Sequence, residues 1–207
     1  MKTNGIKSIA KQEEGCIMNA AETEPVMRLF IAIPLPKVVS DSITRWTQEL
    51  GTQLSFRKWV HPQDYHITLQ FLGDTKAGSV ESVLSSLRTI AAAQQPIQLS
   101  LQGAGVFGPA SAPRILWAGI SGELKKLEHL QQRVTSAMAP LGFAAEDRPY
   151  RPHITAARKL TDGNINSDLL RAGPEPASWT ADGLVLFRTN MHSSPMYEIM
   201  GKMEFGS

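Results

Sequence analysis

The sequence lacks the features that mark several common classes of protein. Cys16 is its only cysteine, which excludes a disulfide framework and a cysteine zinc site and favours a reducing compartment. No apolar run approaches the length of a membrane span, so we expect a cytoplasmic protein without a membrane partner. The net charge of +2 is too small to argue for nucleic-acid binding from charge alone. P-loop, dinucleotide-binding, HxH and HExxH patterns are all missing, so neither a nucleotide cofactor nor a metal is expected.

The length and the amino-terminal composition suggest how the chain is divided. Its 207 residues suit one domain of generous size, or two small lobes that share a core. Residues 1–26 are polar and weakly periodic, and we predict that they form a poorly ordered extension. An apolar segment starts at Met27, so residues 27–207 are predicted to form a single bilobal domain.

What the sequence does contain is an internal repeat. The tripeptide HIT occurs at residues 66–68 and again at residues 153–155, an offset of 87. The same offset places LFIAIP (29–34) on LWAGIS (116–121), and each half has an amphipathic helical pattern between these two matches. A joint match of strand, helix and polar tripeptide indicates a duplicated lobe. We therefore predict two lobes related by an approximate two-fold axis.

Apolar spacing, caps and glycines assign further elements. We predict helices between Pro36 and Gly51, over 80–90, and from an N-cap at Ser121 to just before Gly142. A short helix is expected at 165–171. Further strands are expected at 97–107, 183–188 and 196–205. The segregation of strands and helices within each half predicts an α+β fold, with two pseudo-symmetric lobes of largely antiparallel sheet, helices packed outside and a central cleft.

The two HIT tripeptides explain why an apolar strand carries polar side chains. Residues i and i+2 of a strand share a face, so His66 and Thr68 point one way, as do His153 and Thr155. If a two-fold axis relates the lobes, the two polar faces converge on one ligand.

Two histidines that face one ligand form a natural acid–base pair. A neutral imidazole can take a proton from an attacking water while an imidazolium gives one to a leaving oxygen, each transfer contributing about 10²–10⁴-fold. The threonine hydroxyls would bind phosphate oxygens and the charge that develops on them. Opening of a cyclic phosphate needs these groups and neither a metal nor a cofactor.

The segments around these tripeptides resemble a known family. The chain is similar to the two-histidine phosphoesterases, and most of all to the RNA 2′,3′-cyclic phosphodiesterases, formerly called 2′-5′ RNA ligases. One departure is Ala156, where the family pattern has leucine. The resemblance runs from about Met27 to the carboxyl end, through RLFIAIPLP, WVHPQDYHITLQFLG, PRILWAGI and PYRPHITAARK.

The resemblance implies an activity and roles for the repeated residues. The activity is hydrolysis of terminal 2′,3′-cyclic phosphates on RNA, with the ring opened at the 3′ oxygen to leave a 2′-phosphate. His66 and His153 would be the acid–base pair, and Thr68 and Thr155 would bind the phosphate. By analogy His66 is the acid on the 3′ oxygen and His153 the base on water, although the near symmetry offers no independent way to choose.

Further contacts are expected around this site. Arg158, three residues after Thr155, would pair with the phosphate. Phe71 has the corresponding position in the first half and could border a base pocket, or be an ordinary core residue. The remaining substrate-pocket candidates are Tyr150, Arg151 and Trp59, with Arg57 and Lys58 adding to a modest basic rim.

Two other functions remain open at this point. The chain could be a module that binds nucleotides or RNA ends without turnover, or an enzyme that joins RNA strands through 2′-5′ linkages. The intact histidine pair favours turnover, and dilute aqueous conditions favour hydrolysis over joining. We expect RNA ends or cyclic nucleotides as substrates, and a monomer, because one chain supplies both halves of the site.

Overall fold

The structure, a computed structural model, confirms the predicted α+β class and describes residue 1, residues 24–109 and residues 112–206. Most of the predicted extension at 1–26 lies outside the described residues, and the first strand begins at Val26. The strands are β1 (Val26–Pro34), β2 (Ser55–Trp59), β3 (His66–Lys76), β4 (Ile97–Phe107), β5 (Ile115–Gly122), β6 (Ile154–Asp162), β7 (Ser178–Ala181), β8 (Gly183–Thr189) and β9 (Tyr197–Glu204). The helices are α1 (Lys37–Leu50), α2 (Val80–Ala92), α3 (Leu124–Met138) and α4 (Ser167–Ala172), with short 3₁₀ turns at Pro62–Asp64, Ala77–Ser79 and Ala139–Leu141.

The sheet shows the duplication directly. Its strand order is β7-β4-β5-β6-β3-β1-β8-β9, with β2 pairing to β6, and all described pairings are antiparallel. The offset of 87 residues carries β1 onto β5, α1 onto α3, β3 onto β6, α2 onto α4 and β4 onto β8. The order reads alike outward in both directions from the β3–β6 junction. The two-fold axis therefore passes through that junction.

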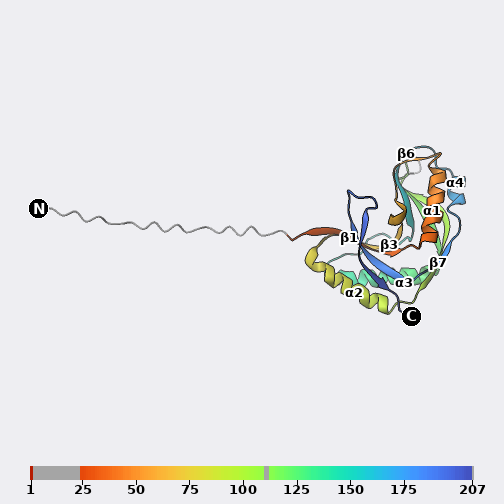
Figure 1. Ribbon diagram of the computed structural model, residues 1–207. Helices are drawn as coiled ribbons and strands as arrows, with labels where there is room; N and C mark the ends of the chain where they lie inside the picture. Colours follow the sequence, from red (N-terminus) through yellow and green to blue (C-terminus); the bar gives the residue numbers. More distant parts are fainter. Residues whose placement is uncertain (2–23, 110–111, 207) are drawn as a thin grey trace.

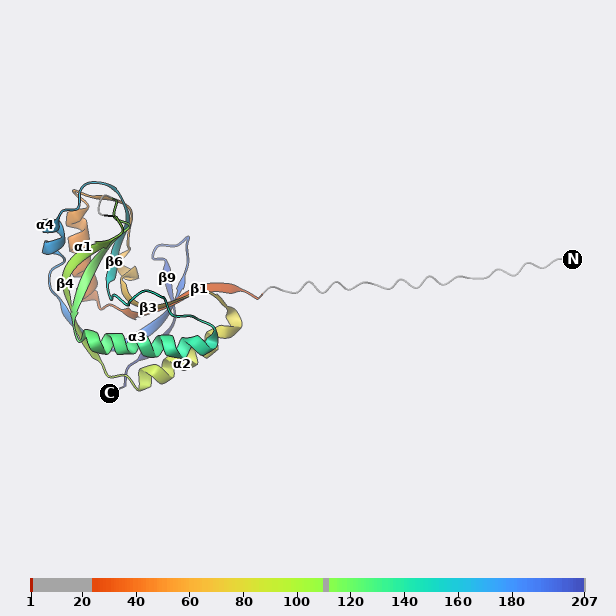
Figure 2. The ribbon, with the colours of Figure 1, turned by 180° about the vertical axis from the view of Figure 1, so that it is seen from behind.

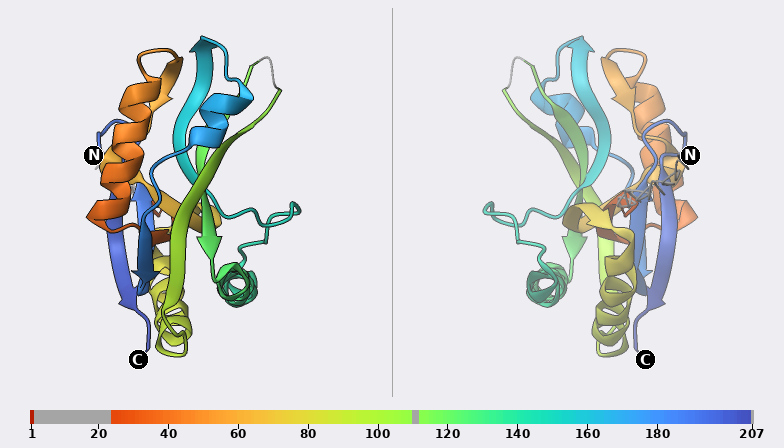
Figure 3. Two further views of the ribbon diagram at one scale, coloured as in Figure 1. Left: turned by 90° about the vertical axis from the view of Figure 1, so that its right-hand side faces the viewer. Right: turned by 90° about the vertical axis from the view of Figure 1, so that its left-hand side faces the viewer.

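The helices form two groups at opposite ends of the molecule. Helices α2 and α3 lie side by side at one end, and α1 and α4 lie at the other (Figures 1 and 3). Seen from behind, α2 and α3 run along the lower edge of the molecule (Figure 2). A large apolar cluster fills the space between the helices and one face of the sheet. Burial of this face leaves the opposite face of the central strands to carry polar groups.

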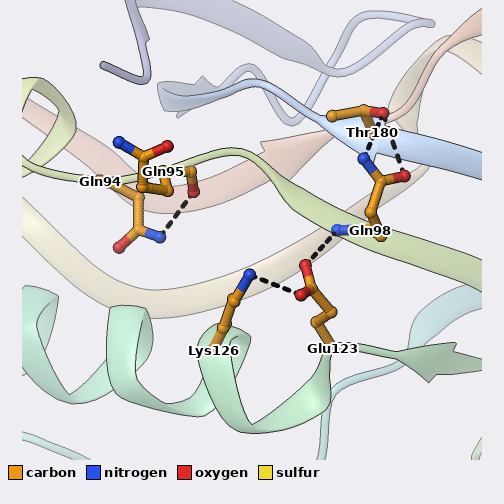
Figure 4. A network of polar contacts seen from close by, with 6 residues as sticks. All are labelled: Gln94, Gln95, Gln98, Glu123, Lys126 and Thr180. Atoms are coloured by element: carbon orange, nitrogen blue, oxygen red, sulfur yellow. Dashed lines mark hydrogen bonds and ion pairs between the residues drawn. The ribbon is translucent and has the colours of Figure 1, made fainter. Parts of the chain in front are cut away.

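The start of α3 differs from the sequence prediction. We expected Ser121 as its N-cap, but β5 continues to Gly122, whose φ of +104° makes the turn, and the N-cap is Glu123. The Glu123 carboxylate accepts from the backbone N–H of Gln98 at 2.9 Å and pairs with Lys126 (Figure 4). The prediction was wrong because a serine that looked like a cap is still paired in the strand.

Other boundaries agree closely with the sequence. The helix expected between Pro36 and Gly51 spans Lys37–Leu50, the strand expected at 97–107 is β4, and the short helix lies at Ser167–Ala172. Strands β2 and β7 were missed, because β2 is rich in cations and β7 has only four residues. No helix within the described ranges combines the length and apolar character needed to cross a membrane.

Candidate active site

The two HIT tripeptides meet at the centre of the sheet. Ile67 of β3 lies opposite Ile154 of β6, and both are fully buried. These two residues are repeat mates, so the pair lies on the two-fold axis. Extending the antiparallel register by one residue in either direction places the histidine of each tripeptide opposite the threonine of the other. The sheet face that carries them, called the histidine face below, holds His66, Thr68, His153 and Thr155.

This register sets the spacing of the two imidazoles. Across antiparallel strands, diagonal neighbours lie about 7–8 Å apart, and His66 and His153 are diagonal neighbours. The charge of His153 also acts on His66, which places the two rings within electrostatic range. One tetrahedral phosphate group can therefore contact both side chains.

Backbone carbonyls fix the tautomer of each histidine. His66 Nδ1 lies 2.7 Å from the carbonyl oxygen of Asp64, and His153 Nδ1 lies 2.7 Å from that of Arg151. A carbonyl oxygen only accepts hydrogen bonds, so Nδ1 carries the hydrogen in both rings. Nε2 is therefore the nitrogen without a hydrogen in the neutral ring of both histidines. The Nε2 atom of His66 lies 3.1 Å from Thr68 Oγ1.

Aromatic rings surround both imidazoles. The His66 ring centroid lies 4.8 Å from that of Phe30 and 5.2 Å from that of Tyr197. On the other side of the axis, His153 lies 4.9 Å from Phe107, edge to face. These rings restrict the orientation of the imidazoles and shield them partly from water.

The loss of water lowers the pKa of both histidines. Burial lowers the pKa of His66 to about 4, and the positive charge of Arg158 and that of His153 add to this effect. Burial and the Arg158 charge also lower the pKa of His153 below its ordinary value. The hydrogen bonds to the backbone carbonyls oppose both shifts without cancelling them. Near neutral pH, both imidazoles of the unliganded protein are therefore mostly neutral.

A repeated bulge explains how Arg158 reaches this site. Just after its HIT tripeptide, β3 carries an extra residue relative to β1, Leu69, and β6 carries its repeat mate relative to β5, Ala156. Three residues beyond Thr155, a side chain would ordinarily point to the opposite face of a strand. The extra residue restores Arg158 to the histidine face, a common use of bulges beside active sites. The Arg158 charge accordingly acts on both histidines.

The same bulge places Phe71, the repeat mate of Arg158. Phe71 is 53% exposed, and its ring centroid lies 5.8 Å from that of Phe30, which itself contacts His66. It is therefore a surface residue at the edge of the histidine face and does not belong to the core. Its role as a border of a base pocket stays a prediction.

Asp64 and Tyr197 form a support that the sequence did not reveal. The buried Asp64 carboxylate accepts from the backbone N–H groups of Met196 at 3.0 Å and Tyr197 at 3.1 Å. These bonds fix the start of β9, and with it the Tyr197 ring beside His66. Burial raises the pKa of the Tyr197 hydroxyl, while the nearby Arg158 charge opposes the rise, so the hydroxyl keeps its proton. The internal repeat of 87 residues did not point to Tyr197 as a residue of this site.

We expect Asp64→Asn to loosen this support. An amide oxygen is a weaker acceptor than a charged carboxylate, and the amide NH₂ would stand where the second carboxylate oxygen now accepts from Met196, so the free energy of unfolding should fall by about 1–3 kcal/mol. Urea denaturation measures this loss. As a control, Asp74→Asn changes an exposed carboxylate on the outer part of β3 and should leave the urea midpoint unchanged. Equal midpoints for the Asp64 variant and the parent protein would contradict the assigned support.

The other predicted pocket residues have different surroundings. The Tyr150 hydroxyl donates to the backbone carbonyl of Thr68 at 3.2 Å, which ties the approach to the second HIT onto β3. The Arg151 side chain is exposed. Trp59 is half-buried on β2, and its ring packs edge to face on Phe56 at 4.9 Å. Among the described residues, no three His, Cys, Asp or Glu side chains gather closely enough to hold a metal ion.

A duplicated antiparallel fold with one HIT strand from each half at its centre is that of the two-histidine phosphoesterases. The model of the 2′-5′ RNA ligase superfamily matches residues 35–192, and the chain belongs to this family.

Curated relatives agree with this assignment. A protein of Geobacillus stearothermophilus named RNA 2′,3′-cyclic phosphodiesterase is 40% identical over 171 residues, which cover 82% of this chain and 54% of that protein. This chain thus spans about half the length of that relative. A Bacillus subtilis protein of the same name is 34% identical, over 84% of this chain and 94% of that protein.

Solved structures show the same fold. The protein TT0787 of Thermus thermophilus has a TM-score of 0.71 at 25% identity, covering 87% of this chain and 100% of that one. Escherichia coli LigT, solved in complex with 3′-AMP, has a TM-score of 0.75 at 23% identity, covering 88% of this chain and 100% of that one.

Proposed function

We propose that this protein hydrolyses the terminal 2′,3′-cyclic phosphate of RNA to a 2′-phosphate by acid–base catalysis between its two histidines. The observation that carries this proposal is the meeting of the two HIT strands at Ile67 and Ile154, with both reactive Nε2 atoms belonging to one sheet face. The names of the curated relatives support the same reaction.

The proposed reaction uses each imidazole once. Water attacks phosphorus and passes a proton to Nε2 of His153, while the bond between phosphorus and the 3′ oxygen breaks. That oxygen takes a proton from Nε2 of His66, which leaves a 3′-hydroxyl and a 2′-phosphate. Thr68 and Thr155 donate to the non-bridging oxygens, and the Arg158 guanidinium stabilises the charge that develops on them. The assignment of acid and base follows analogy, because the site is nearly symmetric. In the free protein the pKa of His66 is lowered further than that of His153, so the assigned roles require the bound phosphodiester anion to raise the pKa of His66.

Several features favour turnover over binding alone. A binding site needs donors for phosphate, but it does not need two imidazoles whose Nδ1 hydrogens are both fixed so that Nε2 faces the ligand. Joining of strands would use an RNA hydroxyl in place of water, and water is in large excess in dilute solution. Since one chain supplies both histidines, we infer that the protein acts as a monomer on RNA ends or cyclic nucleotides, without a metal ion, in the cytoplasm.

The test is direct. The protein is incubated with an oligoribonucleotide that ends in a 2′,3′-cyclic phosphate, with EDTA present. We expect the ring to open to a 2′-phosphate, which phosphorus NMR distinguishes from the 3′ isomer. Loss of the reaction on chelation would remove the metal-free mechanism, and binding without ring opening would leave only a binding module. A control oligonucleotide with a linear 3′-phosphate should be unchanged.

The lowered pKa values predict how the rate depends on pH. The reactive protein has one imidazole charged and the other neutral, a state most populated between the two pKa values. Because both pKa values lie below 6.5 in the free protein, kcat/KM should reach its maximum on the acid side of 6.5. A bound phosphodiester anion favours imidazolium and raises both pKa values, so kcat should reach its maximum at higher pH. A kcat/KM maximum above pH 7, with chemistry shown to be rate-limiting, would contradict the environment described here.

A further inference from the structure

Beside the histidine face lies an open cavity lined by the side chains of four basic residues. It has a volume of about 310 Å³ and is lined by Arg57, Lys58, Arg158 and Lys159. The first two belong to β2 and the others to β6. Within residues 24–109 and 112–206, none of the four forms an ion pair with a carboxylate. The walls of the cavity are mostly apolar, so the aliphatic stems of these side chains form it, and no described carboxylate pairs with their charged ends.

The register of the two strands makes this arrangement unfavourable in the absence of an anion. Lys58 lies directly opposite Arg158 in the β2–β6 pairing, and like charges that face each other across strands destabilise a sheet. The only described side-chain partner of the Lys58 ammonium is the sulfur of Met196 at 2.9 Å, and a thioether is a weak, uncharged acceptor. The following residue, Lys159, has a φ of +58°, which is rare outside glycine. The facing cations and the positive φ of Lys159 both destabilise the fold, so binding of an anionic ligand explains them better than a contribution to folding does.

The cavity and the proposed reaction site share one residue. Arg158 lines the cavity, and its charge acts on both histidines. A strand rises about 3.3 Å per residue, and Ala156 between them is an extra residue in a bulge, so Arg158 lies less than about 10 Å along β6 from Thr155. Two neighbouring phosphates of one RNA end can therefore occupy the histidine face and the cavity at the same time. Met196, which contacts Lys58, directly precedes Tyr197 beside His66, so a second path of contacts joins the cavity to the histidine face.

We infer that this cavity binds the internucleotide phosphodiester next to the cyclic phosphate, so that the protein recognises an RNA end and discriminates against a free cyclic mononucleotide. The inference rests on the proposed function for the identity of the reacting group. Lys58 and Arg57 supply charge to the second phosphate, and Arg158 lies between the two phosphate positions. A mononucleotide offers this cavity no anion and gains nothing from it.

The test compares ligands that differ by one phosphodiester. Calorimetry measures binding of uridine 3′-phosphate and of the dinucleotide UpU bearing a 3′-phosphate, neither of which requires turnover. We expect the dinucleotide to bind about tenfold more tightly to the parent protein. The tighter binding should depend more on salt, with a slope of log affinity against log salt steeper by about 0.7. The variant with both Arg57→Gln and Lys58→Gln should bind the two ligands with nearly equal affinity. The control variant with both Lys76→Gln and Lys125→Gln, on exposed positions of β3 and α3, should keep the full preference.

A second experiment measures turnover of the corresponding cyclic phosphates. The same preference should appear in kcat/KM for UpU ending in a 2′,3′-cyclic phosphate over the cyclic mononucleotide, mainly through KM. Equal binding of both ligands by the parent protein, or a preference that survives in the double variant, would overturn the cavity assignment. A dinucleotide preference in binding without any ring opening would uphold the cavity and refute the proposed reaction. Ring opening with the same kcat/KM for the dinucleotide and the mononucleotide, together with equal binding of the two ligands, would uphold the proposed reaction and refute the cavity assignment.

Discussion

His153→Ala should lower kcat/KM for a cyclic phosphate by about 10³-fold or more while the protein remains folded. The expected size follows from the loss of one proton transfer, which contributes about 10²–10⁴-fold. Folding should tolerate the change, because the ring is only partly buried and its one described hydrogen bond goes to the Arg151 carbonyl. Rates measured on an oligoribonucleotide with a terminal cyclic phosphate, together with thermal unfolding, test both halves of the statement.

Comparison of single and double variants makes this prediction specific to a pair. If His66 and His153 act in one concerted step, the variant that lacks both should be little slower than either single variant. His129→Ala removes an exposed histidine on α3 and serves as the matched control, with no expected change in rate. Unchanged ring opening in a well-folded His153→Ala protein would refute the two-histidine mechanism. Additive losses in the double variant would mean that the two residues act in separate steps.

The centre of the fold could be predicted from the sequence because duplication leaves a pattern that is easy to read. Ile67 and Ile154 are separated by the repeat offset of 87 residues, and they meet on the two-fold axis that this offset implied. Alternation along a strand then predicted that His66 and Thr68 share a face. No propensity argument was needed for these assignments, since each depends only on strand periodicity and symmetry.

The remaining features depend on contacts that periodicity does not encode. Simple alternation would have turned Arg158 away from the site, and only the extra residue at Ala156, visible in the pairing with β5, returns it. Tyr197 reaches His66 because the distant Asp64 carboxylate holds the start of β9. The cationic cavity required strand β2, whose charged sequence resembles a loop. In each case a long-range pairing decides the position of the side chain.

Arg158→Gln should lower kcat/KM by about 10²-fold and should also move the pH optimum upward. A guanidinium that binds the phosphate makes charge-assisted hydrogen bonds that strengthen as negative charge develops, and the loss of one such donor typically costs about 10²–10³-fold in rate. The shift in pH has a separate cause. The positive charge of Arg158 lowers the pKa of both His66 and His153. Its removal lets both values rise toward 6.5, and the maximum of kcat/KM follows them.

These two effects distinguish a contact with the phosphate from a supporting role. Arg158→Lys keeps the charge but loses the planar pair of donors, so it should preserve the pH optimum of the parent protein while recovering only part of the rate. Arg114→Gln, an exposed position preceding β5, controls for a general change in charge near this end of the sheet. If Arg158 only supported the bulge, both of its variants would show the same loss and neither would move the optimum. A lower rate with an unchanged pH profile in Arg158→Gln would therefore place the guanidinium away from the reacting phosphate, and the charge on the transition state would have to be stabilised by the two threonines and the backbone alone.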